Sequence, residues 1–396
     1  MSNAQPLILL PRDEYENRRI KRLRDLMTEA GLEAMLITDN ANTFYITGRV
    51  FMGWIYLPLK GEPIYFVRRP MGLEGDGVIY IRKPELIAES IGQLNMPARL
   101  GMELDVTPWS TVSRLAAIFD GAEIINCSTL LRQARAVKTD YELELLRASG
   151  DKQSRIYRHI AGLYRSGMTD LELQIEIEHK LRLEGCLGQF RISGDSMELF
   201  MGSVLVGDNA DNPTPYDFAM GGEGINPSIP AGANGTVIQR GDTVMVDMNG
   251  NFTGYMTDMT RTYSLGTPAD KALRAHQCSI DICHTLEKIA VPGTPAKALY
   301  QEAERMATES GFHEYFMGHR QKAGFIGHGV GIEINELPVI SPHSRDILAE
   351  GNVIAFEPKF VIPGTGAVGI ENTYLVSADG LKPLADCSEE IQHFSD

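Results

Sequence analysis

Short apolar runs alternate with helical patterns over the first third of the chain. A charge-rich helix is predicted from residue 12, ending at Gly31, and a buried strand follows over 34–38. Two further helices are predicted, one near 84–93 and one over about 109–119. Further short strands are predicted over 63–67, 77–81 and 99–103. Strands that alternate with helices predict a small α/β domain, to which we assign residues 1–138.

The pattern changes near residue 138, where two capped helices are predicted. Residues 139–142 (Thr-Asp-Tyr-Glu) and 169–172 (Thr-Asp-Leu-Glu) both fit a capping box. In this motif the threonine hydroxyl caps the first turn and the glutamate side chain bonds back to the threonine backbone. The first helix is expected to reach about residue 165, and the second to stop at Gly185.

A second pair of helices is predicted at about 268–290 and 295–310. Thr267-Pro268 and Thr294-Pro295 each place a capping hydroxyl before a proline, which favours the first helical position. Strand-rich segments follow each helix pair, so residues 139–396 are predicted to form an α+β domain. An internal duplication is a hypothesis that no residue-level repeat supports directly.

Composition narrows the class of protein. The apolar fraction of 43% is ordinary for a globular chain, and the net charge of −15 offers no basic surface for nucleic acid. No apolar run reaches the about 20 residues that cross a bilayer. The five cysteines form no CxxC pair, which disfavours a disulfide scaffold or a cysteine zinc site. We therefore expect a cytoplasmic protein that binds neither nucleic acid nor membrane.

One acidic residue, Asp247, interrupts an otherwise apolar strand. A buried aspartate must be paired, hydrogen-bonded or bound to a metal. Asp258 follows on the next predicted strand, and the turn between them decides whether they face each other. A two-residue turn at 249–250 would separate them, whereas a turn centred at 252–253 sets Asp247 opposite Asp258. We favour the second turn because Gly254 would relieve its backbone.

Two glutamates are also predicted to face each other. A hairpin centred on Gly364, between strands over 353–360 and 368–376, pairs Glu357 with Glu371. Like charges directly opposite each other destabilise a sheet, and burial would strongly raise the pKa of one of them. A cation between the two carboxylates removes the conflict.

A histidine completes the candidate site. His328 stands among glycines in Gly327-His328-Gly329-Val330-Gly331, which would leave its imidazole unshielded. Four carboxylates and a neutral imidazole carry four negative charges, which two divalent cations balance. Taken singly, each aspartate or histidine has an ordinary structural interpretation; taken together they predict a dinuclear centre. Oxygen-rich ligands favour Mn²⁺, Fe²⁺ or Co²⁺ over Zn²⁺. The predicted ligands are Asp247, Asp258, His328, Glu357 and Glu371.

These residues stand in motifs that resemble the methionine aminopeptidase, prolidase and creatinase superfamily. The matching segments are VDMNGNFTGYMTDMTRT, GHGVGIEINELP, AFEPKF and VGIENTYLV; NTFYITG and KTDYELELLR resemble the N-terminal domain and its junction. The resemblance implies a C-terminal pita-bread fold preceded by a creatinase/prolidase-like α/β domain. It also implies that Asp247 chelates one metal, that Asp258 and Glu371 bridge both, and that His328 and Glu357 hold the other.

The chain departs from this family at substrate-handling positions. Asn335-Glu336 stands where the peptidases usually have His-Glu. The loop before the first metal strand lacks the usual histidine, and Asp211 or Thr214 is the candidate replacement. Gly369 takes the place of a common arginine. These departures predict an intact metal cage with altered handling of substrate.

The resemblance implies a metal-dependent hydrolase like Xaa-Pro dipeptidase or aminopeptidase. Two metals would share a water, lower its pKa and polarise the scissile carbonyl. Glu357 would accept the proton of that water as general base. Asn335 would donate a hydrogen bond where relatives use histidine, and His319 is the candidate to supply the missing proton transfer.

Two other functions are compatible with the same sequence. A non-peptide enzyme on the same cage, like dimethylsulfoniopropionate lyase or creatinase, would not need the peptidase histidines. A non-catalytic binding module is less favoured because the chain keeps all five ligands. We expect a peptide or other small-molecule substrate and a homodimer. Phe51, Trp54 and Tyr56 either reach a substrate pocket or, as we favour, pack within their own domain.

Overall fold

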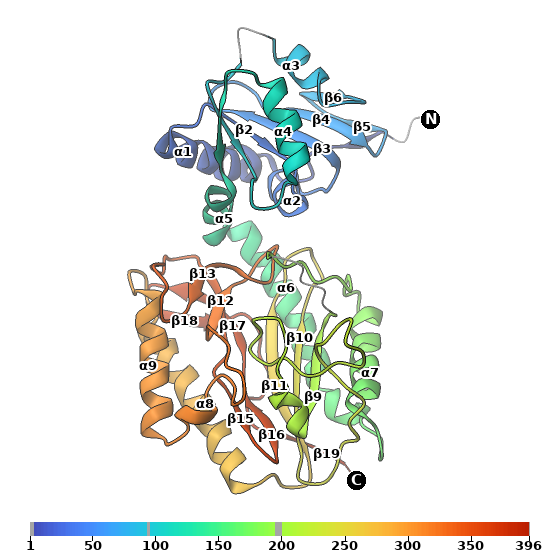
Figure 1. Cartoon of the computed structure of the whole chain (residues 1–396), viewed down its shortest axis with the longest axis vertical. Helices are drawn as coiled ribbons and strands as arrows, with labels where there is room; N and C mark the ends of the chain where they lie inside the picture. The colour runs from blue at the N-terminus through green and yellow to red at the C-terminus, as the bar shows by residue number, and fades with distance from the viewer. Residues whose placement is uncertain (1–3, 93–95, 195–199, 396) are drawn as a thin grey trace. The chain divides into compact units, whose positions relative to one another are not determined.

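The computed structural model describes residues 4–92, 96–194 and 200–395, which divide into two compact units, 1–135 and 136–396 (Figure 1). This division lies close to the domain boundary expected at 138. None of the helices among the described residues is long and apolar enough to cross a bilayer. All five cysteines are buried and free.

The first unit is built on a mixed six-stranded sheet of order β6-β4-β3-β2-β7-β8. Its strands are β2 (Ala34–Ile37), β3 (Met52–Pro58), β4 (Ile64–Arg69), β6 (Val78–Tyr80), β7 (Arg99–Met102) and β8 (Glu123–Asn126). A small parallel pair joins β1 (Gln5–Pro6) to β5 (Leu73–Glu74). The helices are η1 (Glu14–Ile20), α1 (Lys21–Ala30), α2 (Asn40–Thr47), α3 (Leu86–Ile91), α4 (Trp109–Ile118) and α5 (Ser128–Ala136).

The predicted α/β character of this unit is confirmed. Gly31, at φ 65°, caps the end of α1 in the left-handed conformation that glycine adopts without strain. The prediction missed β3 and β8. Trp54 and Tyr56 lie in the apolar core beside the sheet, and Phe51 is also buried. These three aromatic residues are therefore packing residues of the first unit.

The second unit consists of two halves, each with a helix pair and its own sheet. In the first half, α6 (Asp140–Tyr157) and α7 (Asp170–Leu183) pack on the sheet β19-β11-β10-β9. Its strands are β9 (Gly202–Val206), β10 (Thr243–Asn249), β11 (Asp258–Leu265) and β19 (Gln392–Phe394), with 3-10 turns at η3 (Ile160–Leu163) and η4 (Gly207–Asp211). Both predicted capping boxes are present, at Thr139 and Thr169.

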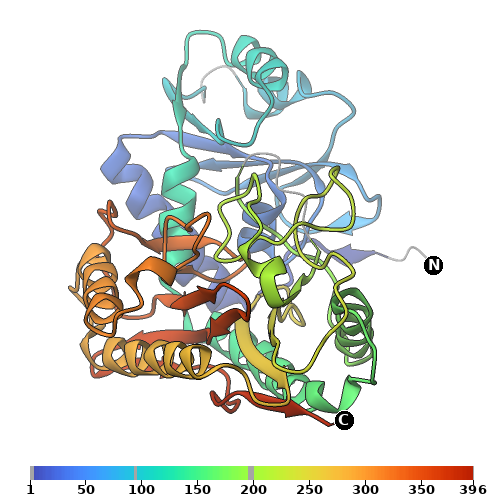
Figure 2. The same ribbon diagram turned by 60° about the horizontal axis from the view of Figure 1, so that its bottom comes forward.

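The second half repeats this plan. Helices α8 (Asp270–Ile289) and α9 (Ala296–Glu309), with a short turn η5 (His313–Tyr315), pack on the sheet β13-β12-β14-β17-β18. Its strands are β12 (Gly327–Gly329), β13 (Glu336–Ile340), β14 (Val353–Phe356), β17 (Asn372–Ser377) and β18 (Gly380–Pro383); β15 (Lys359–Ile362) pairs separately with β16 (Gly366–Gly369). In Figures 1 and 2 the two helix pairs flank the strands of this unit.

Helices α8 and α9 lie within two residues of their predicted ranges, but the predicted caps are wrong. The residue that caps α8 is Ala269, so Pro268 precedes the helix instead of opening it. Pro295 is the cap residue of α9 and takes extended backbone angles. The hydroxyl of Thr294 is used in the preceding turn, where it accepts from the backbone N–H of Val291 and donates to the carbonyl of Ile289.

Candidate metal centre

The β10–β11 hairpin brings Asp247 and Asp258 to the same face but not opposite each other. Asp247 pairs with Thr260, and Asp258 pairs with Asn249, so the predicted register is wrong. The turn lies one residue further along the chain, with Gly254 at φ 90°. Residues two positions apart on facing strands are diagonal neighbours, so the two carboxylates still converge.

The second predicted hairpin has the expected register but is interrupted. β14 pairs with β17, and β15 with β16, as a centre at Gly364 requires. Glu357 and Glu371 lie at facing positions in the break between these two strand pairs. The backbone of Glu371 instead bridges to Thr260 of β11, with its N–H 3.1 Å from the Thr260 carbonyl. This bridge joins the two halves of the unit at the site.

His328 lies on β12, between β13 and β14. A Cβ added to Gly327 or Gly329 would lie 2.4 Å or 2.1 Å from a carbonyl oxygen of a neighbouring strand. The glycines therefore admit the neighbouring backbone, and they do not leave the imidazole unshielded: only 9% of His328 is exposed. Its Nδ1 donates to the Gly329 carbonyl at 3.1 Å, which leaves Nε2 available as a ligand.

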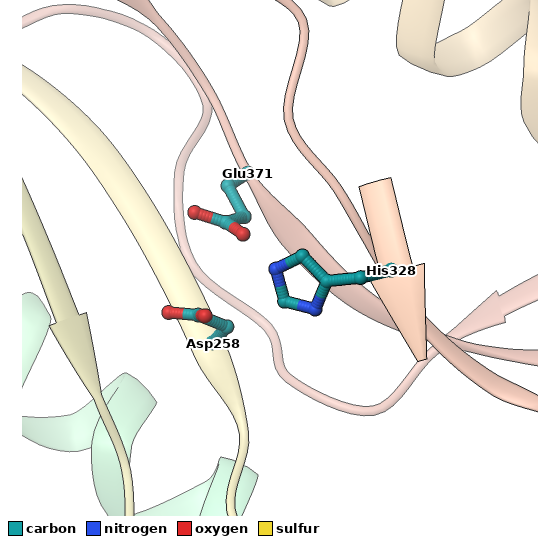
Figure 3. A group of neighbouring side chains, drawn as sticks. All are labelled: Asp258, His328 and Glu371. Atoms are coloured by element: carbon teal, nitrogen blue, oxygen red, sulfur yellow. The ribbon is translucent and has the colours of Figure 1, made fainter. Parts of the chain in front are cut away.

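The five predicted ligands gather in two overlapping groups. Asp258, His328 and Glu371 point toward one another from β11, β12 and the segment before β17 (Figure 3), and their ligand atoms all lie within 4.8 Å. Asp247, Glu357 and Glu371 form a second group within the same limit. Glu371 is common to both groups.

A residue that was not predicted, Lys359, lies inside the second group. Its Nζ donates to Asp247 Oδ2 at 2.9 Å, to Glu357 Oε2 at 2.7 Å and to Glu371 Oε2 at 3.2 Å. Its side chain is completely buried. The sequence did hold a signal: Lys359 is two residues after Glu357, and side chains two apart in an extended segment share a face. Lys359 changes the charge balance from which two divalent cations were predicted.

The charges of this cluster are unevenly compensated. Burial lowers the pKa of Lys359, but the three carboxylates more than reverse this and hold it well above the usual value. Burial raises the pKa of Glu357, but Lys359 and His328 outweigh it and bring that pKa to about 2. Burial and neighbouring carboxylates raise the pKa of Asp258 to about 7 and that of Glu371 well above its usual value.

At Asp258 and Glu371, by contrast, nearby positive charge does not outweigh burial and the neighbouring carboxylates, so the pKa values of both stay raised. Among the described residues, Glu371 Oε1 is buried and has no hydrogen-bond partner. An unpaired, buried carboxylate oxygen in the same cluster as His328 Nε2, which faces Glu357 Oε1 at 3.4 Å, fits a bound divalent cation. The residues present therefore fit a metal at the group formed by Asp258, His328 and Glu371.

A cavity of about 310 Å³ opens onto these residues. Its wall is largely apolar and aromatic, and it includes Phe190, Phe218 and Phe325. Asn335 also lines it, but its amide is engaged: Nδ2 donates to the Ser193 carbonyl at 2.6 Å, and Oδ1 accepts from the Ser193 N–H at 2.8 Å. Asn335 therefore holds one wall segment of the cavity in place.

Three other candidates from the sequence, His319, Asp211 and Thr214, are not among the described residues of the cavity wall. The Nδ1 of His319 bonds to Asp211 Oδ2 at 2.9 Å. The hydroxyl of Thr214 donates to the Pro230 carbonyl at 2.8 Å. Asp211 and Thr214 thus have structural partners of their own. Among the described residues of the cavity wall, His328 is the one histidine.

Arg261 is a second buried residue that the sequence analysis missed. It donates to the carbonyl of Glu371 at 2.8 Å, to Asn372 Oδ1 at 2.7 Å and to the carbonyl of Cys387 at 3.0 Å. Only 1% of it is exposed. The guanidinium therefore fixes the backbone that carries Glu371.

Comparison with known families agrees with this geometry. Residues 144–378 match the model of metallopeptidase family M24, and residues 19–137 match the creatinase/prolidase N-terminal domain. The chain belongs to metallopeptidase family M24. Its fold is accordingly a creatinase-like domain followed by a pita-bread domain, and membership implies a hydrolase with a dinuclear metal site.

Individual M24 proteins resemble the chain over almost its whole length. An Xaa-Pro dipeptidase of Pyrococcus horikoshii is 25% identical over 379 residues, covering 95% of this chain and 99% of that protein. One of Lactobacillus delbrueckii is 29% identical over 392 residues, covering 94% and 98%. The solved X-Pro aminopeptidase of Thermotoga maritima superposes with a TM-score of 0.78 at 22% identity, covering 95% and 99%.

Proposed function

We propose that this M24 protein is a metal-dependent hydrolase that cleaves the bond before proline in X-Pro substrates. The observation that supports it best is the cavity whose wall contains Asp247, Asp258, His328, Glu357 and Glu371. Relatives that match the chain from end to end are named Xaa-Pro dipeptidase or X-Pro aminopeptidase. The carboxylates and the imidazole would hold a metal ion and its nucleophile in the cavity wall. The amide bond of a substrate bound in the cavity would lie next to that nucleophile.

The chain's own groups have separate tasks in this reaction. Asp258, His328 and Glu371 would hold a divalent ion, which supplies an activated water and polarises the substrate carbonyl; the ligand set favours Mn²⁺, Fe²⁺ or Co²⁺ over Zn²⁺. Glu357 accepts the proton at Oε1. Its other oxygen is held by Lys359 at 2.7 Å, whereas Oε1 lies 3.4 Å from His328 Nε2.

The charges of the cavity wall also favour some X-Pro substrates over others. Among its described residues there is no arginine or lysine to pair with a free carboxylate, whereas Asp217 and Asp247 present negative charge. Peptides longer than a dipeptide, or X-Pro amides, place their own carboxylate outside the cavity. The N-terminal ammonium of such a substrate meets the acidic wall favourably. We therefore expect cleavage of longer X-Pro peptides to exceed that of X-Pro dipeptides.

An activity screen tests this function. The metal-free protein is reconstituted with Mn²⁺, Fe²⁺, Co²⁺ or Zn²⁺ and offered X-Pro dipeptides, longer X-Pro peptides and matched X-Ala peptides. The account predicts metal-dependent release of the first residue from the X-Pro peptides. Equal or greater cleavage of the X-Ala peptides, or no cleavage with any metal, would contradict it.

A second candidate is an enzyme for a small cationic molecule. Phe190, Phe218 and Phe325 line the same cavity as the carboxylates, and the faces of aromatic rings attract cations. The engaged amide of Asn335 provides no proton for a leaving amine. Small sulfonium and amidine compounds therefore belong in the same screen, and turnover of these with no X-Pro cleavage would favour the second candidate. The homodimer and the cytoplasmic location stay predictions.

A further inference from the structure

The ammonium of Lys359 has all of its hydrogen-bonding capacity committed to the candidate metal centre. An ammonium group has three N–H donors. Asp247, Glu357 and Glu371 each accept one, at 2.9, 2.7 and 3.2 Å. The side chain is completely buried, and it ends among three carboxylates. This position is therefore built to hold one positive charge.

The same three carboxylates form one of the two groups that could hold a metal. A metal ion would need their oxygens at about 2.0–2.2 Å. The ammonium already lies at hydrogen-bond distance from the same oxygens, and a divalent ion beside it would meet a like charge at short range. Lys359 and a metal ion thus exclude each other at this group.

The backbone around Lys359 supports its entry into the centre. Gly369 faces Lys359 across the β15–β16 pair, at φ 143°. A Cβ added to Gly369 would lie 2.8 Å from the Pro358 carbonyl and 3.0 Å from Lys359 Cα. A larger residue at 369 would push β15 away and withdraw the ammonium. The glycine and the lysine are therefore matched to each other.

The other group is left for a metal. Lys359 contacts neither Asp258 nor His328 in the described hydrogen bonds, and it uses only Oε2 of Glu371. Glu371 Oε1 has no described hydrogen-bond partner. His328 directs Nδ1 to a carbonyl, so its Nε2 faces the carboxylates, with Glu357 Oε1 at 3.4 Å. These groups converge from β11, β12 and the segment before β17 (Figure 3).

We propose that the centre is mononuclear, with the Lys359 ammonium permanently replacing one of the two metal ions of the family's dinuclear site. One divalent ion binds at Asp258, His328 and Glu371. Lys359 keeps Asp247 and Glu357 in place, as a second ion would. This inference concerns the number of ions bound. It rests on one part of the proposed function, that the site binds a metal ion, and not on the substrate.

Metal stoichiometry tests the proposal without reference to activity. The full chain is stripped with chelator and dialysed against increasing Mn²⁺, and bound metal per chain is measured by elemental analysis. Wild type is expected to saturate at one ion. Lys359→Met, which frees three carboxylates, is expected to bind a second ion, whereas Lys359→Arg, which keeps the charge, is expected to bind one.

Two outcomes overturn the proposal: wild type that binds two ions, and a folded Lys359→Met variant that still binds only one. If Lys359→Met does not fold, electron paramagnetic resonance of Mn²⁺-saturated wild type decides. A signal of isolated ions supports the proposal, and that of an exchange-coupled pair contradicts it. Two ions together with metal-dependent X-Pro cleavage would overturn this inference alone, whereas absence of any bound metal would overturn the proposed function as well.

Discussion

Lys359 Nζ lies 2.7 Å from Glu357 Oε2, inside the cluster of candidate metal ligands. Because the lysine is fully buried, its charge is not screened by water and keeps Glu357 ionised. The site is therefore a mixed centre, in which a side-chain cation and a metal ion share one set of carboxylates. The four predictions that follow test separate parts of this arrangement.

Glu371→Gln should reduce Mn²⁺ affinity by at least about 100-fold, because the shared ligand loses its charge and one coordinating oxygen. The exposed Glu390 provides a matched control, and Glu390→Gln should leave the affinity unchanged. Isothermal titration calorimetry on both variants checks the prediction. Wild-type affinity in the Glu371 variant would remove this residue from the centre.

Stability of the metal-free protein should fall as pH rises from about 4 to about 7. The pKa of Asp258 is raised from 3.8 to about 7, so over this window the folded state holds a proton that the unfolded state has lost. Glu371 acts in the same direction. The pKa of Glu357 is instead lowered, from 4.5 to about 2. The stability that ionised Glu357 contributes is therefore lost only as the pH falls toward about 2.

Thermal unfolding in chelator across this range measures the effect, with Asp258→Asn as the comparison. The variant should show a flatter dependence on pH than wild type. Added metal should raise the melting temperature of wild type most at the upper end of this pH range, where Asp258 would otherwise lose its proton. Parallel pH profiles for wild type and variant would show that Asp258 is not the titrating group.

Asn335→His should cleave X-Pro peptides faster than Asn335→Ala. Both variants lose the paired bonds to Ser193, so the difference between them reports the imidazole alone. A well-placed general acid or base contributes about 100-fold or more to rate. Values of kcat and KM on one X-Pro peptide provide the comparison. Equal rates would place position 335 outside the proton transfer and leave it a positioning role.

Arg261→Met should lower the free energy of unfolding by more than about 3 kcal/mol, because each lost hydrogen bond to the charged guanidinium is worth about 1.5–3 kcal/mol. Metal affinity should fall too, since Arg261 holds the Glu371 carbonyl at 2.8 Å. Urea unfolding measures the loss. Arg305→Met, at an exposed surface ion pair, is the control and should leave the free energy of unfolding nearly unchanged. Similar losses in both variants would contradict the anchoring role.

Local signals in the sequence were enough for much of the fold. The capping boxes at Thr139 and Thr169 locate two helix starts because the motif needs only four consecutive residues. The hairpin centre at Gly364 followed from its short turn. The turn after Asp247 was misplaced by one residue, because several longer loops fit the same segment and tertiary contacts choose among them.

Contacts between segments that are distant in the sequence could not be predicted from local patterns. Thr260 bridges to Glu371 across 111 positions in the chain, and its hydroxyl donates to that carboxylate at 2.7 Å. The role of Arg261 depends on the same long-range approach. Lys359 was the exception: its spacing from Glu357 placed it on the same face, but a charge count restricted to acids and histidine left it out.

The most direct test of the account measures X-Pro peptide cleavage and bound Mn²⁺ in the same samples, starting from metal-free protein. The account predicts no cleavage without metal, a rise in rate in proportion to occupancy, and full activity when each chain holds one ion. Activity that survives complete removal of metal, or that appears only after a second ion binds, would contradict it.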